Sequence, residues 1–253
     1  MSTLRAYEKP GTFSERFPIL FNQDNRLQKA EKVIRIISEF SRKDLKSLNC
    51  LDVGASTCLM TAYFARFFGS TIAVDNDWVG LESARKVAQE VNLLRLCGDG
   101  EVLPLKDESV DVVICNHVYE HVLNPQKMVA EIYRVLKPDG FCFFGAGNRF
   151  VVIEGHYFLP FLSWFPNKIS SLYLRMMGRK IDYDVFLYSY FKLKRLLRKF
   201  KIIDYTLPVL KDPGKFAATD LVRANSPVTK VPGWVFRVMY PLLPSYLWIL
   251  VKK

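Results

Sequence analysis

An acid and a glycine stand together near residue 50, and a second acid follows about 20 residues later, a spacing known from nucleotide sites. Asp52 and Gly54 end a short apolar run, and Asp75 ends the next one. A glycine at such a turn lets the backbone bend sharply and leaves room for a ligand beside main-chain atoms. A carboxylate at the end of the second run can accept hydrogen bonds from both hydroxyls of a ribose. These residues predict a site for a nucleotide-like ligand.

The turn is poor in glycine for a pyrophosphate site. Ser56 and Cys58 stand where the second and third glycines of a dinucleotide fingerprint would be. Few glycine amides are then available to cradle a pyrophosphate. The sequence therefore favours an adenosine ligand without phosphates over a dinucleotide, with a βαβ turn that binds nothing as the alternative.

The elements that position these residues are predicted to form a parallel sheet. Two apolar runs enclose a helix-like stretch between Asp52 and Asp75, and a βαβ unit of this kind places the glycine turn at the carboxyl edge of the sheet, where open α/β sheets bind ligands. Near-continuous apolar runs predict further strands that are buried on both faces. These strands are Leu93–Gly100, Val110–His117 and Gly140–Gly147.

Helices are predicted between these strands. One covers Trp78–Val91, and another covers Asn124–Leu136. The second has Asn124 as its N-cap, a proline at its first helical position and Lys137–Gly140 as its stop. Strands that alternate with helices in this way predict a doubly wound α/β fold.

Four blocks of the sequence resemble the class I S-adenosylmethionine-dependent methyltransferases, in particular their broad small-molecule, type 11-like group. The blocks are Leu-Asp-Val-Gly-Ala-Ser at 51–56, Val-Asp-Asn-Asp at 74–77, Gly-Asp-Gly-Glu-Val-Leu-Pro at 98–104 and Glu-Ile-Tyr-Arg-Val-Leu-Lys-Pro-Asp-Gly at 131–140. Their order and spacing match the family. The resemblance implies a Rossmann-like, mostly parallel seven-stranded sheet with its last strand antiparallel, and aromatic insertions after the fifth and sixth strands.

The resemblance also implies S-adenosylmethionine as the cofactor. The loop under its methionine part would consist of Asp52, Gly54, Ala55 and Ser56. Asp75 would bind the ribose hydroxyls, with Asn76 beside the adenine. The adenine amino group would donate to Asp99, with Gly100 alongside, and the sulfonium would lie near Asn116 and His117.

One methyltransferase domain over residues 1–253 is the simplest organisation, since half of the chain is hydrophobic and can fill one large core. Its predicted parts are an N-terminal helical region (1–47), a cofactor-binding core (48–147), a substrate lid insertion (148–187) and a C-terminal half of the sheet (188–253). The last part would contain a helix at Tyr188–Phe200, a second insertion at 208–244 and a final strand at Tyr246–Val251.

Histidines are the candidate catalysts. Methyl transfer from a sulfonium requires an aligned acceptor and, for a hydroxyl, a group that removes its proton. Imidazole titrates near neutrality and suits that task. His156 lies in the lid two residues after Glu154 and is the first candidate, with a role in ordering the lid as the alternative. His117 and His121 follow the fourth strand, and His121 stands at a position that is often structural in the family.

Positive charge gathers in the C-terminal part. The formal net charge is +11, and residues 186–253 carry thirteen Lys or Arg and three acids, a net charge of +10. Val231–Leu250 is strongly apolar, but three prolines and Arg237 interrupt it, so no spanning helix is expected. Apolar aromatics flanked by basic residues suit an anionic membrane surface. The alternative is a cover over the core, with residues 192–201 on a solvated helix face.

Cysteine usage points to a reducing compartment. Four of the five cysteines fall on predicted strands and are expected to be small buried hydrophobes; they are Cys50, Cys97, Cys115 and Cys142. Their spacing does not suit a metal site, and none is expected. The first residues contain no apolar signal region, so the expected location is cytoplasmic, with membrane association as an open alternative.

These observations favour O-methylation of a small or amphiphilic acceptor, such as a glycan, lipid, quinone or natural product. Basic and aromatic residues together would also suit an RNA methyltransferase. Against RNA, the residues Asn116–Tyr119 lack the Pro-Pro-aromatic run used on base amino groups, and the chain lacks a Pro-Cys pair for attack on a pyrimidine. A non-catalytic protein that keeps the fold is the other alternative.

Overall fold

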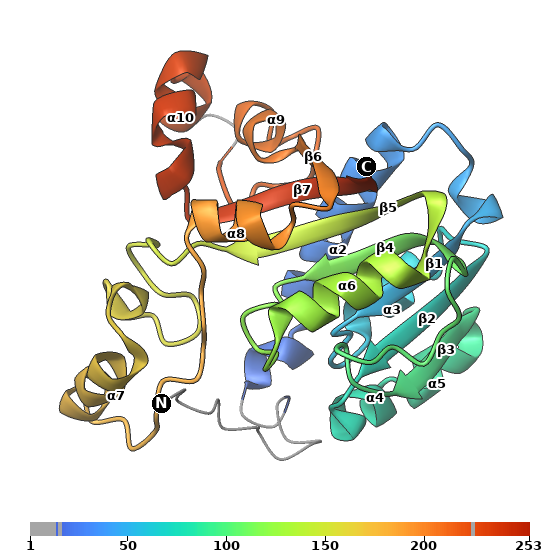
Figure 1. The fold of residues 1–253 in the computed structure, drawn as a ribbon, viewed down its shortest axis with the longest axis horizontal. Helices are drawn as coiled ribbons and strands as arrows, with labels where there is room; N and C mark the ends of the chain where they lie inside the picture. Colours follow the sequence, from blue (N-terminus) through green and yellow to red (C-terminus); the bar gives the residue numbers. More distant parts are fainter. Residues whose placement is uncertain (1–13, 15–16, 224–225) are drawn as a thin grey trace.

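The structure is a computed structural model of the chain, and it describes residues 14, 17–223 and 226–253. A seven-stranded mixed sheet lies at its centre, with the strand order β3-β2-β1-β4-β5-β7-β6 (Figure 1). The strands in chain order are β1 (Asn49–Val53), β2 (Ser70–Asp75), β3 (Leu93–Cys97), β4 (Val110–Asn116), β5 (Leu136–Gly147), β6 (Phe200–Asp204) and β7 (Ser245–Lys252). The first five run parallel, and β7 is antiparallel to both β5 and β6. The predicted doubly wound sheet with an antiparallel last strand is confirmed.

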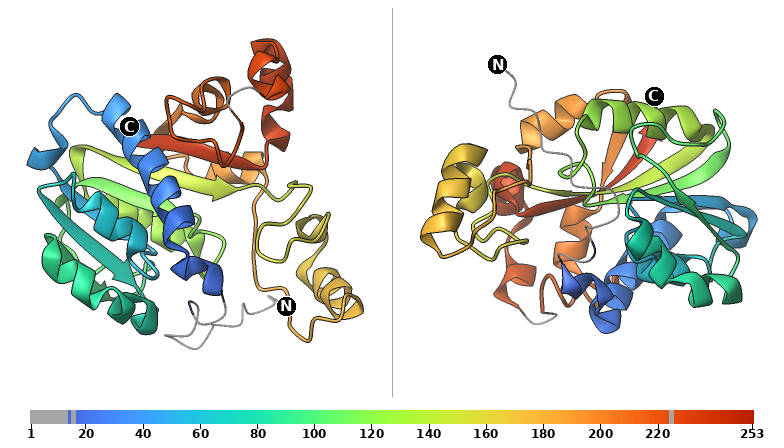
Figure 2. Two further views of the ribbon diagram at one scale, coloured as in Figure 1. Left: turned by 180° about the vertical axis from the view of Figure 1, so that it is seen from behind. Right: turned by 90° about the horizontal axis from the view of Figure 1, so that it is seen from below.

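Helices cover both faces of the sheet (Figure 2). The α-helices are α2 (Gln23–Phe40), α3 (Leu59–Phe64), α4 (Trp78–Ser83), α5 (Arg85–Glu90), α6 (Pro125–Val135), α7 (Asn167–Met176), α8 (Tyr190–Leu196), α9 (Thr206–Lys211) and α10 (Gly233–Met239). The 3₁₀ turns are η1 (Pro18–Phe21), η2 (Leu45–Ser47), η3 (Leu162–Trp164), η4 (Pro227–Lys230) and η5 (Tyr240–Leu242). Because side chains alternate across a strand, Val113 of β4 packs with α6 and α8, while Val112 packs with α2, α3 and α9.

The helix signals in the sequence place most helix ends correctly. The Asn124 side chain accepts from the backbone N–H of Lys127, and α6 ends at Val135. The next residue, Leu136, already begins β5, so Lys137–Gly140 belong to this strand and do not form a separate stop after the helix. The pairing of β5 with β4 has a register irregularity between Val110 and Val112. The single helix expected over 78–91 is two short helices, because Ala84 leaves helical geometry with φ −90° and ψ 8°.

The C-terminal elements also differ in length from the prediction. α8 ends at Leu196, so the helix expected to reach Phe200 is shorter at both ends. Phe200 instead opens β6, where it is buried and pairs with Lys252. The final strand is longer by one residue at each end than the predicted Tyr246–Val251. In the N-terminal region, the described residues form α2 and the 3₁₀ turns η1 and η2, while residues 1–13, 15 and 16 lie outside the described part.

The cysteine prediction is correct for three strands and wrong for one. Cys50, Cys115 and Cys142 are buried, and all five thiols are free. Cys97 is exposed, because it ends β3, an edge strand with a partner on one side only. Burial raises the pKa of the Cys58 thiol to about 12, which suits an inert packing role.

The segment between β5 and α8, residues 148–187, projects beyond the carboxyl edge of the sheet (Figure 1). It carries α7 and a small hydrophobic cluster of its own; the cluster consists of Tyr157, Leu159, Leu162, Leu174, Tyr183 and Val185. The segment returns along the end of β4, where the N–H of Phe186 donates to the carbonyl of Glu120 and the N–H of Tyr188 donates to the Tyr119 hydroxyl. This segment is called the lid below.

Candidate functional site

The glycine turn after β1 leaves no room for a side chain. Gly54 has φ +76°, and a Cβ at this position would lie 2.4 Å from Val118 Cγ2. The N–H of Gly54 donates to the carbonyl of Val74 at 2.9 Å, which ties the turn to the end of β2. The glycine is therefore required both by its left-handed backbone and by the close approach of the segment after β4.

The two positions that lack glycine nevertheless keep a glycine-like backbone. Ser56 has φ 51° and Cys58 has φ 52°, both in the left-handed region. The N–H of Ser56 donates to Asp75 Oδ2 at 2.7 Å, so the turn holds the second acid directly. The Ser56 hydroxyl is buried without a hydrogen-bond partner. The departure from the dinucleotide fingerprint thus changes the side chains at these two positions, while their backbone stays in the left-handed region.

Replacing Ser56 with glycine is expected to stabilise the fold by about 1 kcal/mol. Relief of the left-handed backbone and of the unpaired hydroxyl, each worth about 1–2 kcal/mol, outweighs the added flexibility of the unfolded chain. Thr57→Gly is the matched control, because Thr57 is not left-handed and its hydroxyl donates to the carbonyl of Leu20. Urea unfolding of both variants checks the prediction, and a Ser56→Gly protein less stable than the natural one would contradict it.

Asp75 ends β2 with both carboxylate oxygens facing backbone donors. Oδ2 accepts from Ser56, and Oδ1 accepts from the N–H of Asp77 at 2.8 Å. Each oxygen keeps a lone pair for a further donor. Burial raises the pKa of Asp75, and the backbone hydrogen bonds counter part of that rise. Asn76 beside it is exposed, while Asp77 is buried and caps α4 through the N–H of Gly80.

Asp52 lies under the same loop, and the charge of the half-buried Arg26 acts on it. Its Oδ2 accepts from the Thr61 hydroxyl at 2.5 Å. Burial raises the pKa of Asp52 to about 7, although the Thr61 hydrogen bond and the charge of Arg26 oppose the rise. Arg26 on α2 has a buried Nε without a hydrogen-bond partner, and burial lowers its pKa. A ligand carboxylate would satisfy this donor. Sequence reasoning missed Arg26, because an arginine in an amphipathic helix carries no local signal.

The third acid stands after β3 in the predicted place. Asp99 Oδ1 accepts from the N–H of Glu101 at 2.8 Å, and Asp99 forms a bridge with Val102. A Cβ on Gly100 would approach Val53 Cγ1 at 3.2 Å, so this glycine packs closely on the end of β1. Because β1, β2 and β3 are neighbours in the sheet, Asp52, Asp75 and Asp99 lie side by side along one edge. An adenosine with an amino-acid tail is the kind of ligand that three such anchors suit.

The end of β4 brings Asn116 and His117 to the same edge. A Cβ on Gly145 would lie 2.1 Å from Asn116 Oδ1, so the Asn116 side chain packs on β5. His117 has a left-handed backbone with φ 59°, and its Nδ1 lies 3.1 Å from Glu120 Oε1. The Glu120 side chain is fully buried, and its Oε2 lacks a hydrogen-bond partner. Burial alone would raise the pKa of Glu120, but the hydrogen bond and the nearby histidines lower it overall.

The three histidines gather where the lid meets this segment. The rings of His121 and His156 are 5.0 Å apart and edge-to-face. Burial lowers the pKa of His121 to about 4, so its ring is neutral. His156 Nδ1 lies 2.6 Å from Glu154 Oε1, and the other Glu154 oxygen accepts from the N–H of His156 and of Tyr157. Glu154 therefore fixes both the turn and the ring.

Glu154 makes the His156 ring more basic. Burial alone would lower the pKa of His156, but the hydrogen bond and charge of Glu154, with Glu120 and Asp184 nearby, raise it overall. When Nδ1–H donates to the carboxylate, Nε2 carries the lone pair and can take a proton. Within the described residues, no group of three or more His, Cys, Asp or Glu is arranged to hold a metal ion.

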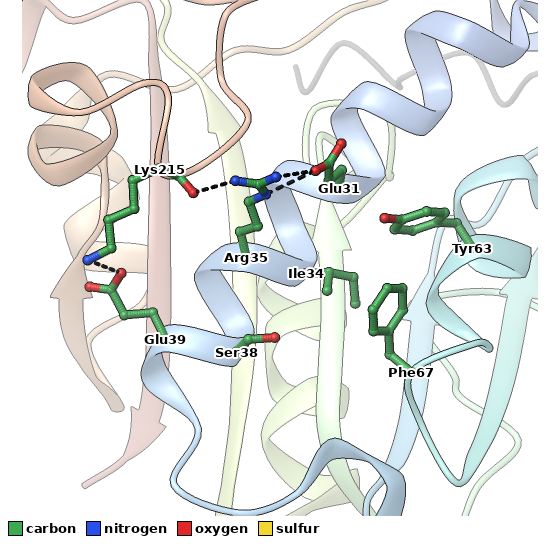
Figure 3. Close-up of a pocket in the computed structure, with 8 residues that line it drawn as sticks. All are labelled: Glu31, Ile34, Arg35, Ser38, Glu39, Tyr63, Phe67 and Lys215. Atoms are coloured by element: carbon green, nitrogen blue, oxygen red, sulfur yellow. Dashed lines mark hydrogen bonds and ion pairs between the residues drawn. The ribbon is translucent and has the colours of Figure 1, made fainter.

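A cavity of about 600 Å³ lies apart from these residues, between α2 and α3 (Figure 3). Its charged lining residues already pair with one another. Arg35 contacts Glu31 at 2.6 Å, and Lys215 contacts Glu39 at 2.6 Å. This cavity therefore presents no unpaired charge that would attract a ligand.

Comparison with known proteins agrees with the site. Residues 51–144 match the family model described as "Methyltransferase domain". A ubiquinone biosynthesis O-methyltransferase from Coxiella burnetii is 31% identical over 107 residues, which cover 42% of this chain and 46% of that protein. The uncharacterized methyltransferase YcgJ from Bacillus subtilis is 32% identical over 48% of this chain and 47% of its own length. The chain thus aligns with about half the length of these curated relatives.

Longer matches exist at lower identity. The uncharacterized protein MJ0638 from Methanocaldococcus jannaschii is 28% identical over 86% of this chain and 96% of its own length. The structure of the PH0226 protein from Pyrococcus horikoshii has a TM-score of 0.58 at 16% identity, and covers 89% of this chain and 90% of that one. Such a likeness shows the shared fold.

Residues 51–144, the part that matches the family model, form a class I S-adenosylmethionine-dependent methyltransferase domain, with the strand order and the glycine turn of that class. The resemblance seen in the sequence is confirmed, and the family implies S-adenosylmethionine as cofactor. The residues present fit it, since the buried, unpaired Nε of Arg26 suits its carboxylate. None of the helices in the described part of the chain is long and apolar enough to cross a membrane.

Proposed function

We propose that the chain transfers the methyl group of S-adenosylmethionine to an oxygen of a small or amphiphilic acceptor, such as a glycan, lipid, quinone or natural product. The observation that carries this proposal is the His156–Glu154 pair, held in the lid beside His121 at the carboxyl edge of the sheet. A base at this place suits a hydroxyl, because a hydroxyl must lose its proton as its oxygen accepts the methyl group.

The roles of the residues follow from their places. Asp75 and Asp99 would hold the adenosine part, and Arg26 would meet the carboxylate of the methionine part. When bound, S-adenosylmethionine supplies a methyl group on a good leaving sulfur. His156 would take the hydroxyl proton at Nε2 while Glu154 holds Nδ1. The lid would exclude water and align the acceptor with the methyl group, which is the main work left to the protein.

An amphiphilic acceptor is favoured by two further observations. The related Coxiella burnetii protein is a ubiquinone biosynthesis O-methyltransferase, although the match covers less than half of it. In addition, the lid helix α7 exposes large apolar side chains, which are Ile169, Leu172 and Met176. An acceptor with a long apolar part is met at a bilayer, so we expect the chain to work at an anionic membrane surface.

The test has a binding arm and a transfer arm. Calorimetry should show S-adenosylmethionine binding in the micromolar range, and incubation with the methyl-labelled cofactor should label a component of a lipid or glycan extract. Absence of cofactor binding would contradict the proposal and favour the alternative of a non-catalytic protein that keeps the fold. Label that enters RNA and neither of the two extracts would favour the RNA alternative.

A further inference from the structure

A second groove shares no residue with the methyl-transfer site and is lined by α8, α9, α10, η5 and the strands β6 and β7. Figure 1 shows α8 and α10 at the β6–β7 end of the sheet. Its volume is about 360 Å³. Its lining residues are aromatic, aliphatic and basic, with one acid; they are Tyr190, Lys194, Ile202, Asp204, Leu207, Arg237, Tyr240, Pro241 and Trp248. The proposed mechanism does not use any of them.

The polar groups in the floor of this groove are already engaged. Trp248 Nε1 donates to the Tyr240 hydroxyl at 2.8 Å, and that hydroxyl donates to Asp204. Asp204 also accepts from the N–H of Thr206 at 3.0 Å. The floor is thus a rigid aromatic surface whose one acid is committed to its neighbours. A ligand would meet rings and not a free carboxylate.

Two cations remain available at the rim. Lys194 on α8 and Arg237 on α10 are both exposed, and neither forms an ion pair with an acid in the described part of the chain. Lys194 Nζ lies 6.0 Å from the centre of the Tyr190 ring. Neither helix contains an acid, and α8 adds Lys192 and Arg195. The cations outnumber Asp204, the one acid that lines the groove, so the groove mouth has a net positive charge that suits a phosphate group.

Large apolar side chains are exposed on the same two helices that carry Lys194 and Arg237. Phe191 on α8 is 70% exposed, and Trp234 and Val238 on α10 are 69% and 70% exposed. Trp234 precedes Arg237 by three residues and Val238 by four, so the three share one side of α10. Met239 and Leu242 are also exposed. A soluble monomer rarely groups this much exposed apolar surface without a partner for it.

We propose that this face docks on an anionic lipid bilayer, with Lys194 and Arg237 at the lipid phosphates and Phe191, Trp234 and Val238 in the interfacial layer. The aromatic floor would lie beneath the head group. Apolar anchors beside basic residues are the pattern of an interfacial membrane surface. This role for the groove rests on the proposed function, in which the acceptor is amphiphilic. Docking of this face on the bilayer would keep the lid near that acceptor.

Other occupants fit less well. A second copy of the chain would bring an equally basic face against this one, and like charges repel. A nucleic acid would use the cations, but its interfaces are polar and would leave Trp234 and Val238 without a function. The bilayer uses both kinds of side chain at once.

Vesicle sedimentation of the full chain tests the proposal. The natural protein should bind vesicles of phosphatidylcholine with one-third phosphatidylglycerol, and bind pure phosphatidylcholine far more weakly. Each basic residue near an anionic surface strengthens binding roughly fivefold, so the Lys194→Glu/Arg237→Glu variant should lose at least about 25-fold. Lys86→Glu/Lys127→Glu is the matched control, because it makes the same charge change on exposed residues of α5 and α6 and should bind within about twofold of the natural protein.

The apolar part has its own comparison. Trp234→Ala should weaken vesicle binding about tenfold, whereas Trp78→Ala, which removes a half-exposed tryptophan from α4, should leave it unchanged. Equal binding by both double-charge variants, or equal binding of the natural protein to neutral and anionic vesicles, would overturn the proposal. A gel shift with RNA, lost in Lys194→Glu/Arg237→Glu and without any vesicle binding, would assign the face to nucleic acid. Vesicle binding does not require turnover, so a failure of methyl transfer would be seen separately.

Discussion

Replacing His156 with alanine is expected to lower kcat by about 10²- to 10⁴-fold, the usual contribution of a positioned base, while the affinity for S-adenosylmethionine stays unchanged. The loss is expected because the buried carboxylate of Glu154 holds His156 Nδ1 at 2.6 Å, which leaves Nε2 for the acceptor proton. The corresponding contact between His117 Nδ1 and Glu120 is longer, at 3.1 Å. The proposed cofactor anchors lie at the ends of β1, β2 and β3, outside the lid, so calorimetry should show the same cofactor affinity for His156→Ala and the natural protein. Single-turnover transfer to the labelled acceptor measures the effect.

Phe158→Ala is the control in the same turn of the lid. Phe158 is exposed and follows His156 by two residues, so its removal should alter kcat by less than about threefold. His121→Ala should have a smaller effect than His156→Ala, because the half-buried ring of His121 has a lowered pKa and stays neutral beside the base. Turnover that His156→Ala leaves unchanged would refute the assignment of this residue as the base.

The pH dependence separates a base from a structural histidine. The pKa of His156 in the folded protein is raised, so the ring loses its proton at a higher pH than an ordinary histidine does. Since only the neutral ring can act as the base, kcat/KM should rise as the pH passes through this raised pKa. Glu154→Gln removes the charge that holds the proton, so the acidic limb of the profile should move to lower pH. A histidine that only orders the lid would leave the limb in place.

The core of the fold could be predicted because its signals are local. Apolar runs predicted where β1 and β2 end and gave both bounds of β4 to within one residue, and Asn124 with Pro125 marked the start of α6. The acids at the strand ends come together once the strands are parallel and adjacent. Strand order then follows from the family topology, so Asp52, Asp75 and Asp99 needed no long-range information beyond the fold.

The remaining site residues depend on contacts between distant segments. Glu120 is placed by the lid, since the N–H of Phe186 donates to its backbone carbonyl and the charge of His156 acts on its side chain. Arg26 can be recognised as a site residue only once the fold brings α2 close to Asp52. Neither hydrophobic periodicity nor helix and strand propensity predicts these contacts between distant segments. The left-handed backbone of Ser56 was also hidden, because a residue type that tolerates this conformation poorly gives no positive signal for it.

Replacing Asp75 with alanine is expected to weaken S-adenosylmethionine binding by roughly 10²- to 10³-fold, because a charged acceptor for two hydroxyls is lost. Part of that loss could come from the loop, since the carboxylate also holds the N–H groups of Ser56 and Asp77. A cofactor product analogue without ribose hydroxyls separates the two contributions. The natural protein should bind 2′,3′-dideoxy S-adenosylhomocysteine at least about tenfold more weakly than S-adenosylhomocysteine, and Asp75→Ala should discriminate between them by less than about twofold.

This non-additivity is the decisive observation for Asp75. If the carboxylate acts only through the loop, removal of the hydroxyls should weaken binding by the same factor in both proteins. Asp77→Ala is the matched control, because Asp77 is buried and caps α4 through Gly80 at the same turn. It should destabilise the loop and still discriminate between the two analogues, since the ribose acceptor remains. If Asp75→Ala discriminates between the two analogues as strongly as the natural protein does, Asp75 does not bind the ribose. A different acceptor along the edge of the sheet would then bind it.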